Sequence, residues 1–128
     1  MSGKFILEII APDRLILKTE TLETIIPSYE GEMGILKDHI PLITFLRPGV
    51  IKVKGDVEKF FFVEEGTVEF SNNCLLILTS TAKELSSLDK DLKDLLISDA
   101  EKKINSEITD KEKYLLSHKI EVLKNISQ

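Results

Sequence analysis

The chain has 128 residues, of which 42% are hydrophobic, and this is enough for the core of one compact domain, with or without an appendage. Its formal net charge of -5 argues against a nucleic-acid partner, because phosphates bind to basic surfaces. Its single cysteine, Cys74, excludes a disulfide framework and a metal site built from several thiolates, and indicates a reducing compartment.

The first two thirds of the chain are predicted to form short β-strands. The N-terminal "MSGKFILEII" has the features of neither a secretory signal nor a transit peptide, and no apolar run approaches the ~20 residues that span a bilayer. Glycines and prolines, which all lie at or before residue 66, separate segments rich in β-branched and aromatic residues. In chain order, the expected strands are 5–11, 14–20, 21–29, 49–54, 57–63, 66–70 and 74–81.

Two of the connections are typical of β-hairpins, namely the turn pair at 55–56 and the Ser-Asn-Asn turn at 71–73. Many short strands with a turn about every ten residues predict an antiparallel β-sandwich or barrel. The segments 5–10 and 74–79 are apolar at almost every position, so we expect both of their faces to be buried in the middle of the sandwich.

From Leu88 onward the apolar residues follow the period of a helix. They recur every four positions, at Leu88, Leu92, Leu96, Ala100, Ile104 and Ile108. Ser86 with Asp89 resembles a capping box for this helix, and Thr109 with Glu112 for a second one. The apolar face of the second helix is Leu115, Leu116, Ile120, Val122, Leu123 and Ile126. The sequence therefore predicts a β-sandwich over residues 1–85 and an antiparallel two-helix hairpin over residues 86–128.

The segment "YEGEMGILKDHIPLI", residues 29–43, combines three carboxylates with a histidine. Asp38 and His39 are adjacent, and neighbours on an extended chain point in opposite directions, so they do not predict an acid–base pair. His39 with Glu30 or Glu32 matches no familiar spacing of metal ligands. We therefore expect neither a catalytic residue nor a metal ligand here. Composition alone favours an exposed polar connection between strands, with glycines at positive φ.

The same segment resembles the hallmark of the epsilon subunits of F-type ATP synthases, the bacterial and plastid counterparts of the mitochondrial delta subunit. The matching residues are Glu30, Gly31, Glu32, Gly34, His39, Pro41 and Leu42. "LRPGVIKV", "EEGTVEF" and "LLILTSTA" resemble later blocks of the family, although the usual Gly-Gly pair is Glu65-Gly66 here. The resemblance implies a non-catalytic rotor subunit without a cofactor, which couples ion-driven rotation of the c ring to ATP synthesis.

The resemblance also implies the partners and the place of the chain. The sandwich would bind the gamma subunit and, through a loop that includes Glu30, Gly31, Glu32, Gly34, His39 and Pro41, the polar loops of the c ring. The helical hairpin would either fold down on the sandwich or extend into the alpha and beta subunits and inhibit ATP hydrolysis. Because residues 110–128 carry only about one net positive charge, we expect the folded-down position and weak inhibition. The subunit would be peripheral, on the cytoplasmic face of a bacterial inner membrane, with no transmembrane segment of its own.

Some members of the family bind ATP through a motif of Ile or Leu, Asp, two variable residues, Arg and Ala. Leu88 and Asp89 match it, whereas Leu92 and Lys93 stand in place of the arginine and the alanine. Because the guanidinium group is missing, we expect ATP binding to be weak or absent. An alternative from another class is a free-standing β-sandwich interaction module, which would bind a partner through the aromatic run 60–62.

Overall fold

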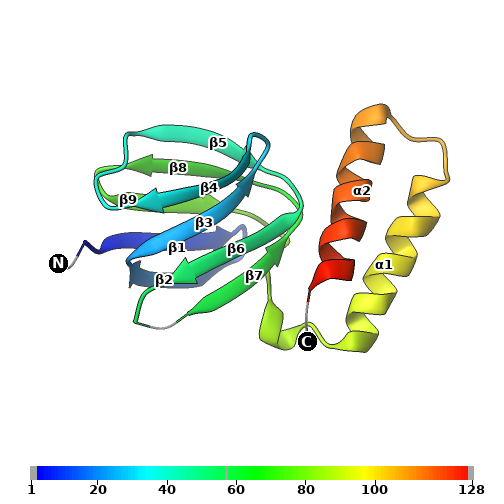
Figure 1. Cartoon of the computed structure of the whole chain (residues 1–128), viewed down its shortest axis with the longest axis horizontal. Helices are drawn as coiled ribbons and strands as arrows, with labels where there is room; N and C mark the ends of the chain where they lie inside the picture. The colour runs from blue at the N-terminus through cyan, green and yellow to red at the C-terminus, as the bar shows by residue number, and fades with distance from the viewer. Residues whose placement is uncertain (1–2, 57, 127–128) are drawn as a thin grey trace.

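The computed structural model describes residues 3–56 and 58–126, which form a β-sandwich with a two-helix hairpin along one side (Figure 1). Within these residues the strands are β1 Phe5–Ala11, β2 Arg14–Thr21, β3 Glu23–Ser28, β4 Gly31–Leu36, β5 Leu42–Leu46, β6 Gly49–Lys54, β7 Lys59–Val63, β8 Gly66–Ser71, β9 Cys74–Leu78 and β10 Lys83–Glu84. A 3₁₀ turn at Leu85–Ser87 leads to α1 Lys90–Ile104 and α2 Asp110–Asn125. The expected β-sandwich followed by a helical hairpin is confirmed, although Val57, the first residue of one expected strand, lies outside the described residues.

The strands follow the hydrogen-bonded order β10-β7-β6-β3-β5-β8-β9-β1-β2, with β4 on the free side of β3. The pairing of β3 with β5 is limited to Ser28 and Leu46, and there the sheet folds over into two layers. The first layer contains β4, β3, β6, β7 and β10, and the second contains β5, β8, β9, β1 and β2. One pair departs from the expected antiparallel pattern, because β1 runs parallel to β9. These two strands are distant in sequence, so no hairpin dictates their direction.

The core lies between the two layers. Its fully buried side chains include Leu7 and Ile9 of β1, Ile26 of β3, Ile51 of β6 and Ile77 of β9. Burial of both faces of β1 and β9 was expected, and this prediction is wrong. Alternate residues of these strands face outward, so that Ile6 is 41% exposed and Leu78 is 45% exposed. The second layer therefore has an outer face that carries apolar side chains.

The segment expected to be a loop contains a strand. Gly31–Leu36 forms β4 and pairs residue by residue with Glu23–Ser28 of β3. Ile35 points into the core, which fixes the face that β4 presents. The expectation of positive φ is confirmed at Gly31, where φ is 115°, and it is wrong at Gly34, which is an ordinary strand residue. Asp38 has the second positive φ of this segment, 66°.

The helices begin where their capping side chains bind backbone amides. Asp89 is the N-cap of α1 and accepts a hydrogen bond from the Leu92 N–H at 2.8 Å, so the capping box predicted from Ser86 is wrong by three residues. Leu88 consequently precedes α1, and Ile108 follows it. The capping box predicted at Thr109 and Glu112 is confirmed. Neither helix of the described chain is long and apolar enough to cross a membrane.

Helix α2 lies between the sandwich and α1 (Figure 1). A second apolar cluster joins the hairpin to the first layer through the buried residues Phe62, Leu88, Leu123 and Ile126. At the neighbouring end of β7, Lys119 Nζ lies 3.0 Å from the Glu64 carboxylate, and the lysine side chain is only 13% exposed. The hairpin thus covers part of the outer face of the first layer, over β6 and β7.

The capping box makes the start of α2 sensitive to acid. The Thr109 backbone N–H and then its hydroxyl donate to the Glu112 carboxylate, and these bonds lower the pKa of Glu112 below its ordinary value. A lowered pKa contributes stability above the ordinary value, and this contribution is lost as pH falls through the lowered one. We expect amide protection of residues 110–113 to fall in that acidic range. Glu112→Gln keeps the capping geometry and should remove this step, as hydrogen exchange at several pH values can show.

Candidate functional site

The residues expected to form one ring-facing loop lie at two ends of β4. Glu30, Gly31 and Glu32 occupy the β3–β4 turn and the start of the strand, whereas His39 and Pro41 follow its end. Six strand residues at ~3.3 Å each separate the two ends by about 20 Å. The structure therefore does not bring Glu32 and His39 together.

The β3–β4 turn is held by hydrogen bonds from a buried serine. Ser28 Oγ donates to the Gly31 carbonyl at 2.7 Å and accepts from the Glu30 N–H at 3.2 Å. The Thr44 hydroxyl donates to the Glu30 carboxylate at 3.2 Å. The backbone at this turn is therefore shaped by Ser28 and Gly31, while the Glu30 carboxylate remains at the surface.

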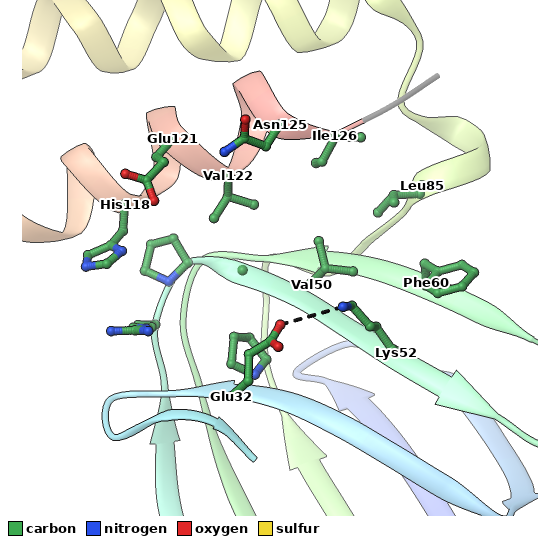
Figure 2. A pocket seen from close by; sticks show the side chains of 14 residues that line it. Glu32, Val50, Lys52, Phe60, Leu85, His118, Glu121, Val122, Asn125 and Ile126 are labelled. Atoms are coloured by element: carbon green, nitrogen blue, oxygen red, sulfur yellow. Dashed lines mark ion pairs between the residues drawn. The ribbon is translucent and has the colours of Figure 1, made fainter. Parts of the chain in front are cut away.

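A groove of about 590 Å³ lies between the first layer and α2. Figure 2 shows Val50 and Phe60 on its sheet side and Val122 and Ile126 on its helix side. Glu32 reaches into its mouth and lies 3.7 Å from Lys52 Nζ (Figure 2). The Glu32 side chain is 63% exposed, so this ion pair is worth at most ~1 kcal/mol. Sequence reasoning missed the groove, because its two walls are distant in sequence.

The opposite end of β4 is fixed by hydrogen bonds to the β8–β9 turn and by a ring contact of His39. The Asp38 N–H donates to the Asn73 side-chain oxygen at 2.7 Å, and the Asn73 amide donates to the Asp38 carboxylate at 2.9 Å. The His39 ring meets the edge of Phe70 with centroids 5.9 Å apart. Burial, then the charge of Glu8, raises the pKa of the Cys74 thiol, which makes it a poor nucleophile. Across the described residues, no group of three or more His, Cys, Asp or Glu could hold a metal ion.

The outer face of the second layer carries a row of four apolar side chains and one threonine, which sequence reasoning also missed. The strand pairing places Phe45, Thr67, Leu78, Ile10 and Leu15 side by side across β5, β8, β9, β1 and β2. We call these five residues the outer row. Phe45 is 56% exposed and Leu15 is 55% exposed. A contiguous exposed apolar patch of this kind marks an interaction surface. The available signal was the apolar run 42–46, in which Thr44 is the one polar residue.

Leu88 and Asp89, which match the first two residues of the family's nucleotide motif, have structural roles in this chain. Leu88 is fully buried beneath the hairpin, and Asp89 caps α1. Lys93, which stands where the motif has alanine, donates from Nζ to the Ile126 carbonyl at 3.0 Å. These contacts explain the positions of the three side chains without any bound nucleotide.

Comparison with known proteins assigns the two parts of the chain to one family. Residues 4–85 match the family model described as ATP synthase, Delta/Epsilon chain, beta-sandwich domain. The ATP synthase epsilon chain of Pelagibacter ubique is 46% identical over 99% of this chain and 100% of its own length. The chloroplastic epsilon chain of Pyropia yezoensis is 41% identical over 78% of this chain and 70% of its own length.

Solved structures show the same fold. A chain of the Euglena gracilis mitochondrial ATP synthase, in a structure of OSCP, F1 and c-ring, superposes with a TM-score of 0.76 at 22% identity, covering 95% of this chain and 78% of that one. A chain of the Tetrahymena thermophila mitochondrial ATP synthase, from its central stalk and c-ring, gives a TM-score of 0.69 at 15% identity, covering 93% of this chain and 92% of that one.

Proposed function

Because this chain belongs to the ATP synthase delta/epsilon family, we propose that it is a non-catalytic central-stalk subunit that couples rotation of the c ring to ATP synthesis. The exposed apolar outer row is the observation that carries the proposal, because an isolated monomer rarely leaves such a face uncovered. Within the complex the subunit is peripheral, on the cytoplasmic face of a bacterial inner membrane.

The outer row is the proposed surface for the gamma subunit. The first layer is the weaker candidate, because the hairpin covers Phe62, and Phe61 belongs to the core. Of the aromatic run 60–62 that a free-standing interaction module would use, Phe61 and Phe62 are buried, and Phe60 stays partly exposed on the wall of the groove. The second layer keeps Phe45, Leu78 and Leu15 exposed in one row, and aromatic and aliphatic side chains of this kind form the centres of protein interfaces.

The turn containing Glu30, Gly31 and Glu32 is the proposed contact for the polar loops of the c ring. A single ring loop cannot reach this turn and also His39, because the length of β4 separates them. We therefore assign the ring contact to the β3–β4 turn, and assign to Gly34, His39 and Pro41 the shaping of β4 and of its far end. Extension of the hairpin toward the alpha and beta subunits would break its apolar cluster, so we propose that it is a weak brake on hydrolysis.

The ring contact is expected to depend on backbone shape more than on charge. Gly31→Val forces a β-branched residue into φ 115° and should weaken binding to the c ring more than Glu32→Gln does. Gly34→Val is the control, because this glycine has ordinary strand geometry and a Cβ there would meet only the flexible carboxylate of Glu23, at 3.1 Å. Reconstitution with purified c ring and gamma measures the three affinities. Equal losses for the first two variants would contradict this ranking.

We also propose that residues 1–85 are a folding unit. A fragment that ends at Leu85 retains the core between the two layers and loses only the cover over Phe62 and Val50. It is expected to fold cooperatively and to bind gamma, with lower solubility than the full chain. Circular dichroism, thermal melting and a gamma pull-down test this. If the fragment unfolds without a cooperative transition, the folding unit must also include Leu88 and the hairpin.

Coupling itself is tested in membranes whose ATP synthase lacks this chain. ATP-driven ion pumping is measured before and after the purified chain is added back, and ATP hydrolysis is measured in parallel. In membranes that still carry the catalytic head, we expect the added chain to restore ATP-driven pumping. The proposed role would be contradicted if ATP were hydrolysed without ion pumping after the chain is added back, or if the added chain changed neither activity.

A further inference from the structure

Three side chains fasten the first half of α2 to the sandwich. The rings of Tyr29 and Tyr114 are stacked at an interplanar angle of 15°, with centroids 6.4 Å apart. Arg47 donates from its guanidinium group to the Tyr114 hydroxyl at 3.1 Å. We call Tyr29, Arg47 and Tyr114 the clasp. It joins the β3–β4 turn and the β5–β6 connection to α2, three segments that are distant in sequence.

The clasp differs from the rest of the hairpin contact. Near the chain connection, Phe62, Leu88 and Leu123 are fully buried in a dry apolar cluster. Tyr114 lies twelve residues before Ile126, which is ~18 Å along a helix that rises 1.5 Å per residue. Tyr29 and Tyr114 are both partly exposed, at 39% and 41%. The cluster therefore holds the end of α2 firmly, whereas the clasp holds its beginning by a few solvent-accessible contacts.

The position of the Tyr29 ring is set by the β3–β4 turn. The Tyr29 N–H donates to the Phe45 carbonyl at 3.2 Å, and Ser28 Oγ on its other side donates to the Gly31 carbonyl. Gly31 closes the turn at φ 115°, a conformation that side chains disfavour. A change of the backbone at Gly31 must therefore move Tyr29, the stacking partner of Tyr114.

We propose that the clasp couples the conformation of the β3–β4 turn to the docking of the first half of α2, residues 110–118. The coupling belongs to the chain alone. If the proposed function holds, a ring loop seated at Glu30 and Glu32 would act on α2 through the same three side chains. The turn would then link the ring contact to the hairpin, which are otherwise two independent features of the chain.

Hydrogen exchange of the full-length chain, measured by mass spectrometry, tests the coupling without any partner. Gly31→Ala strains the turn, yet a Cβ at this position meets no atom within 4 Å, so it cannot push on α2 directly. We expect protection of residues 110–118 to fall about three- to tenfold, while protection of residues 119–125 stays unchanged. Asn72→Ala is the matched control, because it alters a positive-φ residue, at 52°, in the β8–β9 turn at the opposite end of the sandwich.

Tyr114→Leu completes the cycle. On its own it should lower protection of residues 110–118 as much as Gly31→Ala does, and adding Gly31→Ala to it should produce no further loss. Tyr29→Leu replaces Gly31→Ala if that variant does not fold. Full additivity of the two changes, a normal α2 in Gly31→Ala, or an equal loss in Asn72→Ala would each overturn the proposal. Because no partner is present, these outcomes leave the proposed central-stalk role standing.

Discussion

Gly66→Ala is expected to be among the most destabilising single substitutions in the sandwich. Gly66 begins β8 with φ 157°, and a Cβ placed there would lie 2.6 Å from the Leu78 carbonyl oxygen and 3.0 Å from side-chain atoms of Leu46 and Thr79. Strain at a disfavoured φ costs ~1–3 kcal/mol, and overpacking costs ~1–3 kcal/mol more. The free energy of unfolding should therefore fall by about 2–6 kcal/mol, measured by denaturant titration.

Gly34→Ala is the matched control for this prediction. It also adds one methyl group to a strand glycine, but its closest neighbour is the movable Glu23 carboxylate at 3.1 Å. We expect a change of less than ~1 kcal/mol, of either sign. Similar losses in the two variants would show that the close approach of Gly66 to Leu78 does not matter.

Phe45→Glu is expected to abolish stable binding to gamma while leaving the chain folded. Phe45 is 56% exposed on the outer row, so its replacement should change the free energy of unfolding by no more than ~0.5 kcal/mol. In an interface the same change would bury an unpaired carboxylate next to Thr67, within the outer row. Loss of a central anchor costs ~2 kcal/mol or more, which corresponds to at least ~30-fold in affinity.

Leu95→Glu on α1 provides the comparison. Leu95 is also 56% exposed, but it lies on the hairpin, away from the outer row. Binding of both variants to purified gamma can be measured by calorimetry, with circular dichroism to verify folding. We expect Leu95→Glu to bind like the unaltered chain. If Phe45→Glu also binds normally, gamma does not use the outer row.

Local signals were sufficient for the parts of the fold that are determined by neighbouring residues. The turn at 71–73 joins β8 to β9, where Asn72 and Asn73 both adopt positive φ. The spacing of Thr109 and Glu112 gave the start of α2 to the residue. The change of apolar period at Leu88 separated the strands from the helices.

Features that arise from long-range pairing were not visible in the sequence. The parallel partner of β1 is β9, almost seventy residues away. Phe62 lies on the outer face of its strand and is buried because the hairpin docks over it. The segment 29–43 reads as a loop because of its glycines and charges, yet pairing with β3 makes its middle a strand. The separation of Glu32 from His39 follows from that pairing. The outer row follows from the pairing of β5, β8, β9, β1 and β2.

Recovery of the native complex tests the central claim most directly. The chain is expressed with an affinity tag, membranes are solubilised in mild detergent, and the bound proteins are identified and quantified by mass spectrometry. As a central-stalk subunit the chain should recover gamma in equal amounts together with the c subunits, and Phe45→Glu should lose them while Leu95→Glu retains them. Recovery of the tagged chain alone, with gamma and the c ring left intact in the membranes, would contradict the proposed function.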